Sequence, residues 1–236
     1  MFIELVEWLR CVNEHEKTWL VATADRVEER DIVQGVLGCP VCKAEYPISD
    51  GIADFSAARE GGAVPPAREN ADSTGATMYG RGSAYGCGAA NEAEGAFRLA
   101  ALLNLDEPGG FVVLCGRWSS LARSLVGLRR GVHVLLFNPA TTELSGAGVS
   151  IAKAGNEIPL RVGSCRGIAV DSSHQHCSRS WLDSAVAALR PGGRLAVPAQ
   201  IAIPQGTLTL AIDDQLWVGA RAETAALTSI SRRQRT

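Results

Sequence analysis

Four residues near the N-terminus have the types and spacings that bind zinc. Cys39 and Cys42 enclose Pro40 in a Cys-x2-Cys knuckle, which can present two thiolates to one ion. A structural zinc site needs two further ligands, and the upstream candidates are Cys11 and His15. Together these residues predict a Cys3His site. Two alternatives stay open: a metal-free knuckle with buried thiols, and a redox pair, for which the strand and helix of a thioredoxin-like site are missing from the pattern.

A second candidate site follows the apolar run at residues 111–115, which predicts a buried strand. The run leads through Gly116, Arg117 and Trp118 into a helix expected over residues 119–128. In α/β nucleotide-binding folds this strand-turn-helix holds the cofactor, on a glycine-rich loop that lets backbone approach the ligand without Cβ atoms in the way. Here one glycine is followed by two bulky side chains. Whether this loop can hold a cofactor is therefore the main functional question.

Further polar residues follow the strand expected at residues 167–170. Asp171 could act as a general base or as a helix cap, and we expect the cap. His174, His176 and Cys177 could form a second metal site or simply a polar surface loop, and we expect the loop. Cys115 is a poor candidate nucleophile because it ends a buried strand and has no base nearby in the sequence.

The elements that must position these residues alternate between strand and helix from residue 93 onward. This order predicts an α/β fold, a Rossmann-like and mostly parallel sheet with flanking helices. The expected helices cover 93–105, 119–128 and 180–189. The expected strands cover 111–115, 132–137, 149–154, 167–170 and 194–197, followed by an antiparallel pair at 208–212 and 216–219.

The chain divides into four parts by composition. Residues 1–58 predict a small zinc-ribbon-like α+β domain, with short strands at 19–22 and 33–37 around a charged turn at 25–31. Residues 59–92 are rich in Gly, Ala and Pro and predict a connector. Residues 93–224 form the Rossmann-like domain, and 225–236 a tail with three arginines.

Composition excludes some classes of function. Lys and Arg number 23 against 25 Asp and Glu, a net charge of −2, so the chain has no basic footprint for nucleic acid. No signal peptide is evident, because Glu4 and Glu7 interrupt the N-terminal apolar stretch. No transmembrane segment is expected, because the longest uncharged window, residues 195–212, contains Pro198, Pro204 and Gly206 and is typical of strands around a turn. We expect a cytoplasmic protein, which could be peripheral to a membrane complex through a protein partner.

The N-terminal motifs carry a family resemblance over residues 1–56. The knuckle Cys39-Pro40-x-Cys42 and the triplets Tyr46-Pro47-Ile48 and Asp50-Gly51-Ile52 resemble the zinc-ribbon-like domains of the tRNA-methyltransferase-activator family. That family usually has two cysteines in its first ligand pair, where this chain has only Cys11. The resemblance implies a domain that is not an enzyme and that docks on or precedes a methyltransferase.

The C-terminal region resembles the class I S-adenosylmethionine-dependent methyltransferases over most of residues 93–221. The most specific segment is WLDSAVAALRPGGRLAV at 181–197, similar to the helix, Pro-Gly-Gly turn and strand of that family. The resemblance implies cofactor contacts from Cys115, Gly116, Arg117, Trp118 and Asp171. It also places Asn138 where the family has a ribose-binding acidic residue, and Arg166 where it has an acidic residue before the fourth strand.

The changes at these cofactor positions predict a degenerate site. Trp118 would fill the loop, Arg117 would repel the sulfonium, and losing a charged acceptor at Asn138 would cost on the order of 1.5–3 kcal/mol. We therefore expect a non-catalytic methyltransferase-like protein that acts as a structural, assembly or regulatory subunit of a larger complex, with zinc as its cofactor. The alternatives are an active S-adenosylmethionine-dependent methyltransferase with an atypical loop, and a nucleotide sensor that uses Arg117.

Overall fold

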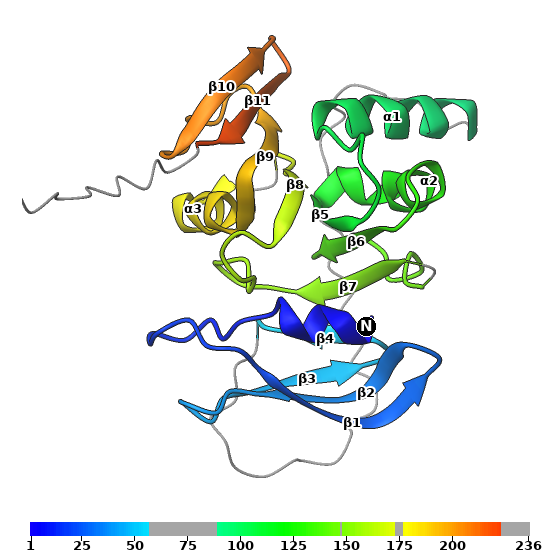
Figure 1. Cartoon of the computed structure of the whole chain (residues 1–236), viewed down its shortest axis with the longest axis vertical. Coiled ribbons are helices and arrows are strands. Elements are labelled where there is room, and N and C mark those ends of the chain that lie inside the picture. Colours follow the sequence, from blue (N-terminus) through cyan, green and yellow to red (C-terminus); the bar gives the residue numbers. More distant parts are fainter. Residues whose placement is uncertain (57–88, 147, 173–176, 223–236) are drawn as a thin grey trace, which may run out of the picture.

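The computed structural model describes residues 1–56, 89–146, 148–172 and 177–222 (Figure 1). Most of the expected connector and the whole expected tail lie outside these ranges, as do His174 and His176. The boundaries predicted for them therefore stay predictions.

One mixed sheet of eleven strands runs through the described residues, in the order β1-β2-β3-β4-β7-β6-β5-β8-β9-β11-β10 (Figure 1). The strands from β4 through β7, β6, β5 and β8 to β9 are parallel to one another. The pairs β1–β2, β2–β3, β3–β4, β9–β11 and β11–β10 are antiparallel. The strands are β1 (Val21–Glu28), β2 (Asp31–Gly38), β3 (Glu45–Ser49), β4 (Ile52–Asp54), β5 (Gly110–Cys115), β6 (Val132–Phe137), β7 (Val149–Lys153), β8 (Cys165–Ala169), β9 (Leu189–Pro198), β10 (Thr207–Ile212) and β11 (Leu216–Arg221).

The α/β class with a mostly parallel, Rossmann-like sheet is confirmed. From β5 onward the chain builds outward first through β6 and β7, and then returns to the other side of β5 with β8 and β9. The strand order therefore reverses between β5 and β8. In open α/β sheets, ligands bind outside the carboxyl ends of the strands at such a switch point. Here those ends carry Gly116 after β5 and Asp171 after β8.

Helices cover one face of this sheet. Helices α1 (Ala89–Leu102) and α2 (Ala122–Leu128) pack Leu99 and Leu125 against Val112, Leu114 and Val134. The alternate residues of the same strands point to the opposite face, as the period of two in a strand requires. Both faces of the central strands are buried, which explains their continuous apolar sequences.

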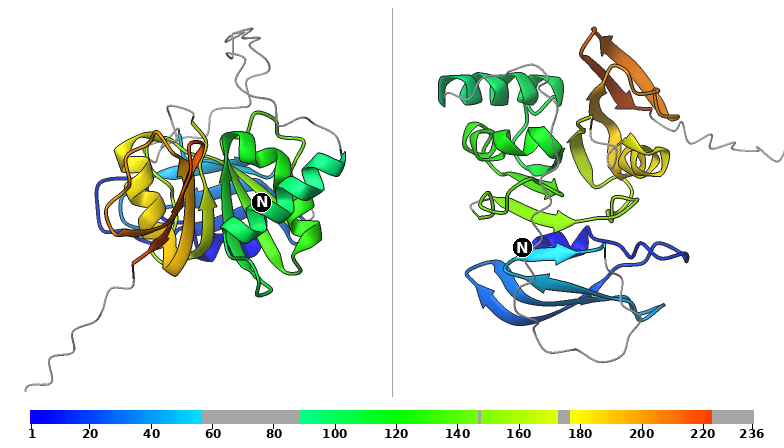
Figure 2. Two further views of the ribbon diagram at one scale, coloured as in Figure 1. Left: turned by 90° about the horizontal axis from the view of Figure 1, so that it is seen from above. Right: turned by 180° about the vertical axis from the view of Figure 1, so that it is seen from behind.

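The opposite face is covered by α3 (Arg179–Ala188) together with the N-terminal segment that contains the 3-10 helix η1 (Ile3–Glu7). Leu5, Leu9 and Trp181 lie in one apolar cluster with Val113 and Phe137. Residues 154–164, between β7 and β8, contain no helix, and the N-terminal segment lies over the sheet there (Figures 1 and 2). It takes the place of the crossover helix that normally joins parallel strands.

The N-terminal strands extend the same sheet. Ile52, Ala53 and Asp54 of β4 pair in parallel with residues 151–153 of β7. A second strand-like contact joins residues 8–10 to residues 159–161, with Arg10 N donating to Pro159 O at 2.9 Å and Arg161 N to Trp8 O at 2.7 Å. The parts predicted as separate domains thus share one sheet and one core.

Four details of the expected elements need correction. The charged turn at 25–31 is wrong, because β1 continues to Glu28 and the hairpin turns at Glu29, whose φ is 52°. Residues 119–121 belong to a 3-10 helix, η2 (Gly116–Leu121), rather than opening an α-helix. The first α-helix begins at Ala89, four residues earlier than expected. The Pro-Gly-Gly turn lies inside β9, where a Cβ on Gly193 would approach Arg166 O to 3.0 Å.

Candidate functional site

The structure brings the four predicted zinc ligands together. The ligand atoms of Cys11, His15, Cys39 and Cys42 all lie within 4.8 Å of one another. The Cys11 and Cys42 sulfurs are 3.6 Å apart, and His15 Nε2 lies 3.1 Å from Cys11 Sγ and 3.4 Å from Cys39 Sγ. Tetrahedral zinc with ligand bonds of about 2.0–2.3 Å separates two sulfurs by about 3.8 Å, and sulfur from nitrogen by about 3.5 Å. The donor set and its spacing therefore fit one zinc ion.

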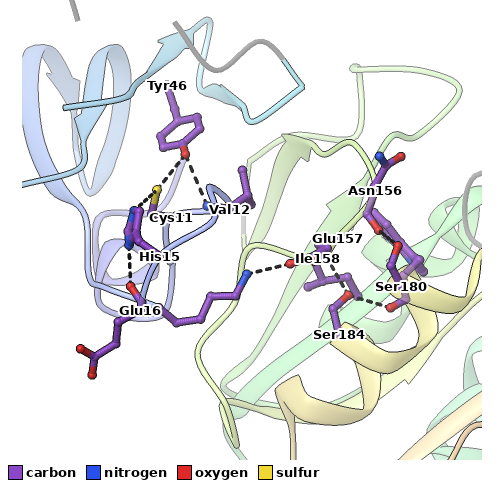
Figure 3. A network of polar contacts seen from close by, with 12 residues as sticks. Cys11, Val12, His15, Glu16, Tyr46, Asn156, Glu157, Ile158, Ser180 and Ser184 are labelled. Atoms are coloured by element: carbon purple, nitrogen blue, oxygen red, sulfur yellow. Dashed lines mark hydrogen bonds and ion pairs between the residues drawn. The ribbon is translucent and has the colours of Figure 1, made fainter. Parts of the chain in front are cut away.

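Neighbouring groups orient these ligands. His15 Nδ1 lies 2.6 Å from the carbonyl oxygen of Glu16, which accepts a hydrogen bond from Nδ1 and leaves Nε2 to face the thiols (Figure 3). The Tyr46 hydroxyl lies 3.1 Å from Cys11 Sγ, and Asn13 Nδ2 donates to Cys42 Sγ at 3.3 Å. Donors of this kind stabilise bound thiolates, as the outer shell of a metal site does.

Polar contacts continue from the metal cluster towards α3. Lys17 pairs with Glu157 at 2.7 Å, and next to it Ile158 N donates to the Ser184 hydroxyl at 2.9 Å. The Ser180 hydroxyl donates to Asn156 O at 2.9 Å (Figure 3). The N-terminal segment that contains Cys11 and His15 therefore contacts the segment between β7 and β8 through Lys17 and Glu157. The sequence alone could not show this contact.

The crevice at the switch point is partly filled by Asp171. Its carboxylate accepts a hydrogen bond from the backbone N–H of Arg117 at 3.2 Å. The carboxylate also lies directly over Gly116, because a Cβ built on that glycine would be 1.8 Å from Asp171 Oδ2. Gly116, which has no Cβ and a φ of 59°, leaves room for the Asp171 side chain. Asp171 thus binds the start of η2, while Ser178 caps α3 by accepting from Trp181 N.

Trp118 also lies at the carboxyl ends of β5 and β8. Its indole Nε1–H donates to Val170 O at 3.1 Å, linking the loop after β5 to the end of β8. The Arg117 guanidinium lies 5.3 Å from the centre of the indole ring, within cation–π range. The side chain expected to fill the loop therefore bridges the two strands that flank the switch point.

Asn138 uses its amide on the chain's own backbone. Its Nδ2 donates to Ala154 O at 2.9 Å, and its Oδ1 accepts from Ala154 N at 3.0 Å. Its φ is 47°, a left-handed conformation that asparagine tolerates better than most residues. The side chain continues the β6–β7 ladder one step beyond the strands. Both polar ends of the amide are thus engaged in the fold.

Arg166 does not lie with the other predicted cofactor residues. It occupies the second position of β8, near the start of β5, at the opposite end of the strands from Gly116. Its guanidinium donates to the backbone carbonyls of Asn104, Glu107 and Gly109. The structure therefore does not bring Arg166 together with the other predicted cofactor residues, because Arg166 lies at the amino end of β8 whereas Gly116 follows the carboxyl end of the parallel strand β5.

The cysteines near the crevice are poor nucleophiles. Cys115 is fully buried, and burial raises the pKa of its thiol well above the usual value, with Asp171 acting in the same direction. Cys177 donates from its thiol to Asp171 O at 3.3 Å, and burial also raises its pKa. Both thiols therefore stay protonated at neutral pH.

Comparisons with known proteins give only distant similarities. No family model matches the chain, and no curated protein matches it. Among solved structures, the MycE methyltransferase of mycinamycin biosynthesis is 9% identical over 61% of this chain and 52% of its own, with a TM-score of 0.45. A chain in the complex of the Haloferax volcanii Trm112 methyltransferase activator with a candidate methyltransferase is 12% identical. The alignment covers 54% of this chain and 89% of that one, with a TM-score of 0.41. A geranyl diphosphate C-methyltransferase from Streptomyces coelicolor is 16% identical over 44% of this chain and 42% of its own, with a TM-score of 0.37.

The aligned part of this chain spans about half the length of the MycE and geranyl diphosphate methyltransferases. The helices in the described ranges are too short or too polar to cross a membrane.

The sequence analysis missed three hydrogen-bonding partners at these sites. Asn13 donates to Cys42, the Glu16 carbonyl bonds His15, and the Val170 carbonyl accepts from Trp118. Backbone carbonyls leave no trace in a sequence pattern, but Asn13, between two predicted ligands, could have been considered.

Proposed function

We propose that this chain is a non-catalytic methyltransferase-like protein, a structural or regulatory subunit of a larger protein complex that carries one structural zinc ion. The observation that carries the proposal is the packing of Asp171 and Trp118 at the switch point. Asp171 lies over Gly116, and Trp118 bridges to Val170, where an α/β fold would admit its ligand.

The engaged amide of Asn138 supports the same conclusion. A ribose could reach this amide only by competing with two backbone hydrogen bonds, each contributing about 1 kcal/mol. Loss of a carboxylate acceptor, an engaged amide and a closed loop act together against a methyl donor. A retained scaffold whose ligand-binding positions are engaged by the chain's own residues is what a subunit selected for its surfaces would show.

Calorimetry on the full chain tests the non-catalytic function. We expect no binding of S-adenosylmethionine or S-adenosylhomocysteine up to about 1 mM, a limit of roughly −4 kcal/mol. A micromolar dissociation constant for either ligand would overturn it. The subunit function is tested separately by sizing the protein in extracts of its native host, where migration only at the size of the free chain would contradict it.

Metal analysis tests the zinc site. We expect one equivalent of zinc in the purified protein and a loss of metal in Cys39→Ser. Cys177→Ser is the control, because Cys177 is a half-buried free cysteine that lies outside the cluster. Equal metal contents in the two variants would contradict the assignment.

A further inference from the structure

The three cysteines of the metal cluster differ in how easily a reagent can reach them. Cys11 and Cys39 are 0% and 2% exposed, whereas Cys42 is half-buried. The thiolate is both the form of cysteine that binds a metal and the form that reacts as a nucleophile. Because oxidation follows thiolate character and exposure, Cys42 is the sulfur of this cluster that an oxidant meets first.

A second sulfur lies close enough to react with an oxidised Cys42. The distance between Cys11 Sγ and Cys42 Sγ is 3.6 Å, so the two sulfurs need to approach by about 1.5 Å to form a bond. Polar contacts hold both sulfurs in place. The Tyr46 hydroxyl lies 3.1 Å from Cys11 Sγ (Figure 3), and Asn13 Nδ2 donates to Cys42 Sγ at 3.3 Å. An exposed cysteine next to a resolving cysteine is the usual arrangement of oxidation-sensitive thiols.

A bond between these two sulfurs would join the same two segments that a metal ion joins. One segment carries Cys11 and His15, and the other carries Cys39 and Cys42. A disulfide within the knuckle, between Cys39 and Cys42, would leave the first segment without a link through the cluster. The bond between Cys11 and Cys42 keeps that link, so the fold can survive the loss of the metal.

We propose that Cys42 and Cys11 are an oxidation-sensitive pair, which a hydroperoxide converts to a disulfide with release of the zinc ion; the release rests on the zinc site proposed above. The Cys42 thiolate attacks one peroxide oxygen, the O–O bond breaks, and hydroxide leaves, so that Cys42 becomes a sulfenic acid. The Cys11 thiolate then attacks the Cys42 sulfur, the S–S bond forms, and a second hydroxide leaves. Both hydroxides take up protons from solvent to give water. The two sulfurs together lose two electrons, which the peroxide gains.

His15 and Cys39 are the ligands of the cluster that remain after this step. Structural zinc sites use four ligands, so two do not retain the ion. The full chain, purified without oxygen and with its zinc, is titrated with hydrogen peroxide in the presence of a chromogenic zinc chelator. We expect about one equivalent of zinc to be released for each equivalent of peroxide consumed. Mass spectrometry of the digested, alkylated protein should show a peptide pair linked through Cys11 and Cys42, which reductant and added zinc reverse.

The control variant is Cys177→Ser, which should release zinc in the same proportion because Cys177 lies outside the cluster. Circular dichroism of the oxidised protein should show a retained fold. Zinc that stays bound at about ten equivalents of peroxide would overturn the proposal, as would a disulfide between Cys39 and Cys42 or a sulfinic acid at Cys42 without a cross-link. A chain purified without zinc would contradict the zinc site instead, and the peptide map of that sample would still decide whether Cys11 and Cys42 pair.

Discussion

His133 makes the contact between the N-terminal segment and the C-terminal sheet sensitive to pH. Its ring stacks on Phe2 with centroids 4.3 Å apart, and its Nε2 lies 3.1 Å from the Ser150 hydroxyl. Burial lowers the pKa of His133 from 6.5 to about 4. Asp31 raises this pKa by a smaller amount, and the N-terminal amino group lowers it further. The neutral imidazole is therefore the form that the fold accepts.

The sign and size of the pH effect follow from this shift. Between pH 6.5 and 4 the unfolded chain binds a proton at His133 that the folded chain does not, so stability falls as the pH falls through this range and levels off below it. The gap between 6.5 and about 4 corresponds to roughly 3 kcal/mol, and partial exposure of the ring reduces it to about 2 kcal/mol. Above pH 6.5 the contribution is fully present.

Urea denaturation followed by tryptophan fluorescence measures this effect. The matched variant is His133→Asn, which can still hydrogen-bond Ser150 but does not titrate. Between pH 7 and pH 4, the free energy of unfolding should fall by about 2 kcal/mol more in the unaltered protein than in the variant. Contributions from the rest of the chain are common to both proteins and cancel in the difference. Parallel pH curves for the two proteins would refute the reasoning.

Three further predictions concern the metal and the crevice. Cys39→Ser should lower the free energy of unfolding by at least about 3 kcal/mol. We expect a single unfolding transition, because Cys11 and Cys39 share one apolar core with Trp181 of α3. Two separate transitions would show independent domains. Asn138→Asp should cost about 1–3 kcal/mol in chemical denaturation, since a carboxylate cannot donate to Ala154 O, and an unchanged stability would contradict the observed pairing. Trp118→Ala should cost about 2–3 kcal/mol by the same assay, from the lost hydrogen bond and packing, and a neutral result would show that the indole does not close the edge.

The sequence predicts the central strands well because burial on both faces demands continuous apolar runs. Strands β5 and β6 begin and end within one residue of the predicted limits for this reason. Strand β1 was underestimated because almost all its side chains are exposed, which leaves no alternating pattern to detect. The three-residue strand β4 is too short to recognise from its sequence alone.

Long-range contacts account for what could not be predicted. The ladder between residues 8–10 and 159–161 joins parts of the chain about 150 residues apart, and only backbone atoms form it. The cluster of Cys11, His15, Cys39 and Cys42 was predictable because side-chain type and spacing carry the signal. The contact of Asp171 with Gly116 was not, because 54 residues separate Arg117, which donates to it, from the carboxylate.

The indole proton of Trp118 reports most directly on whether the crevice is closed. Its resonance can be assigned in a nitrogen–proton NMR spectrum by comparison with Trp118→Phe, and followed while S-adenosylmethionine is added to about 1 mM. If the bond to Val170 O closes the crevice as described, the resonance stays in place and exchanges slowly with water. A saturable shift of this resonance at micromolar ligand would contradict the central claim.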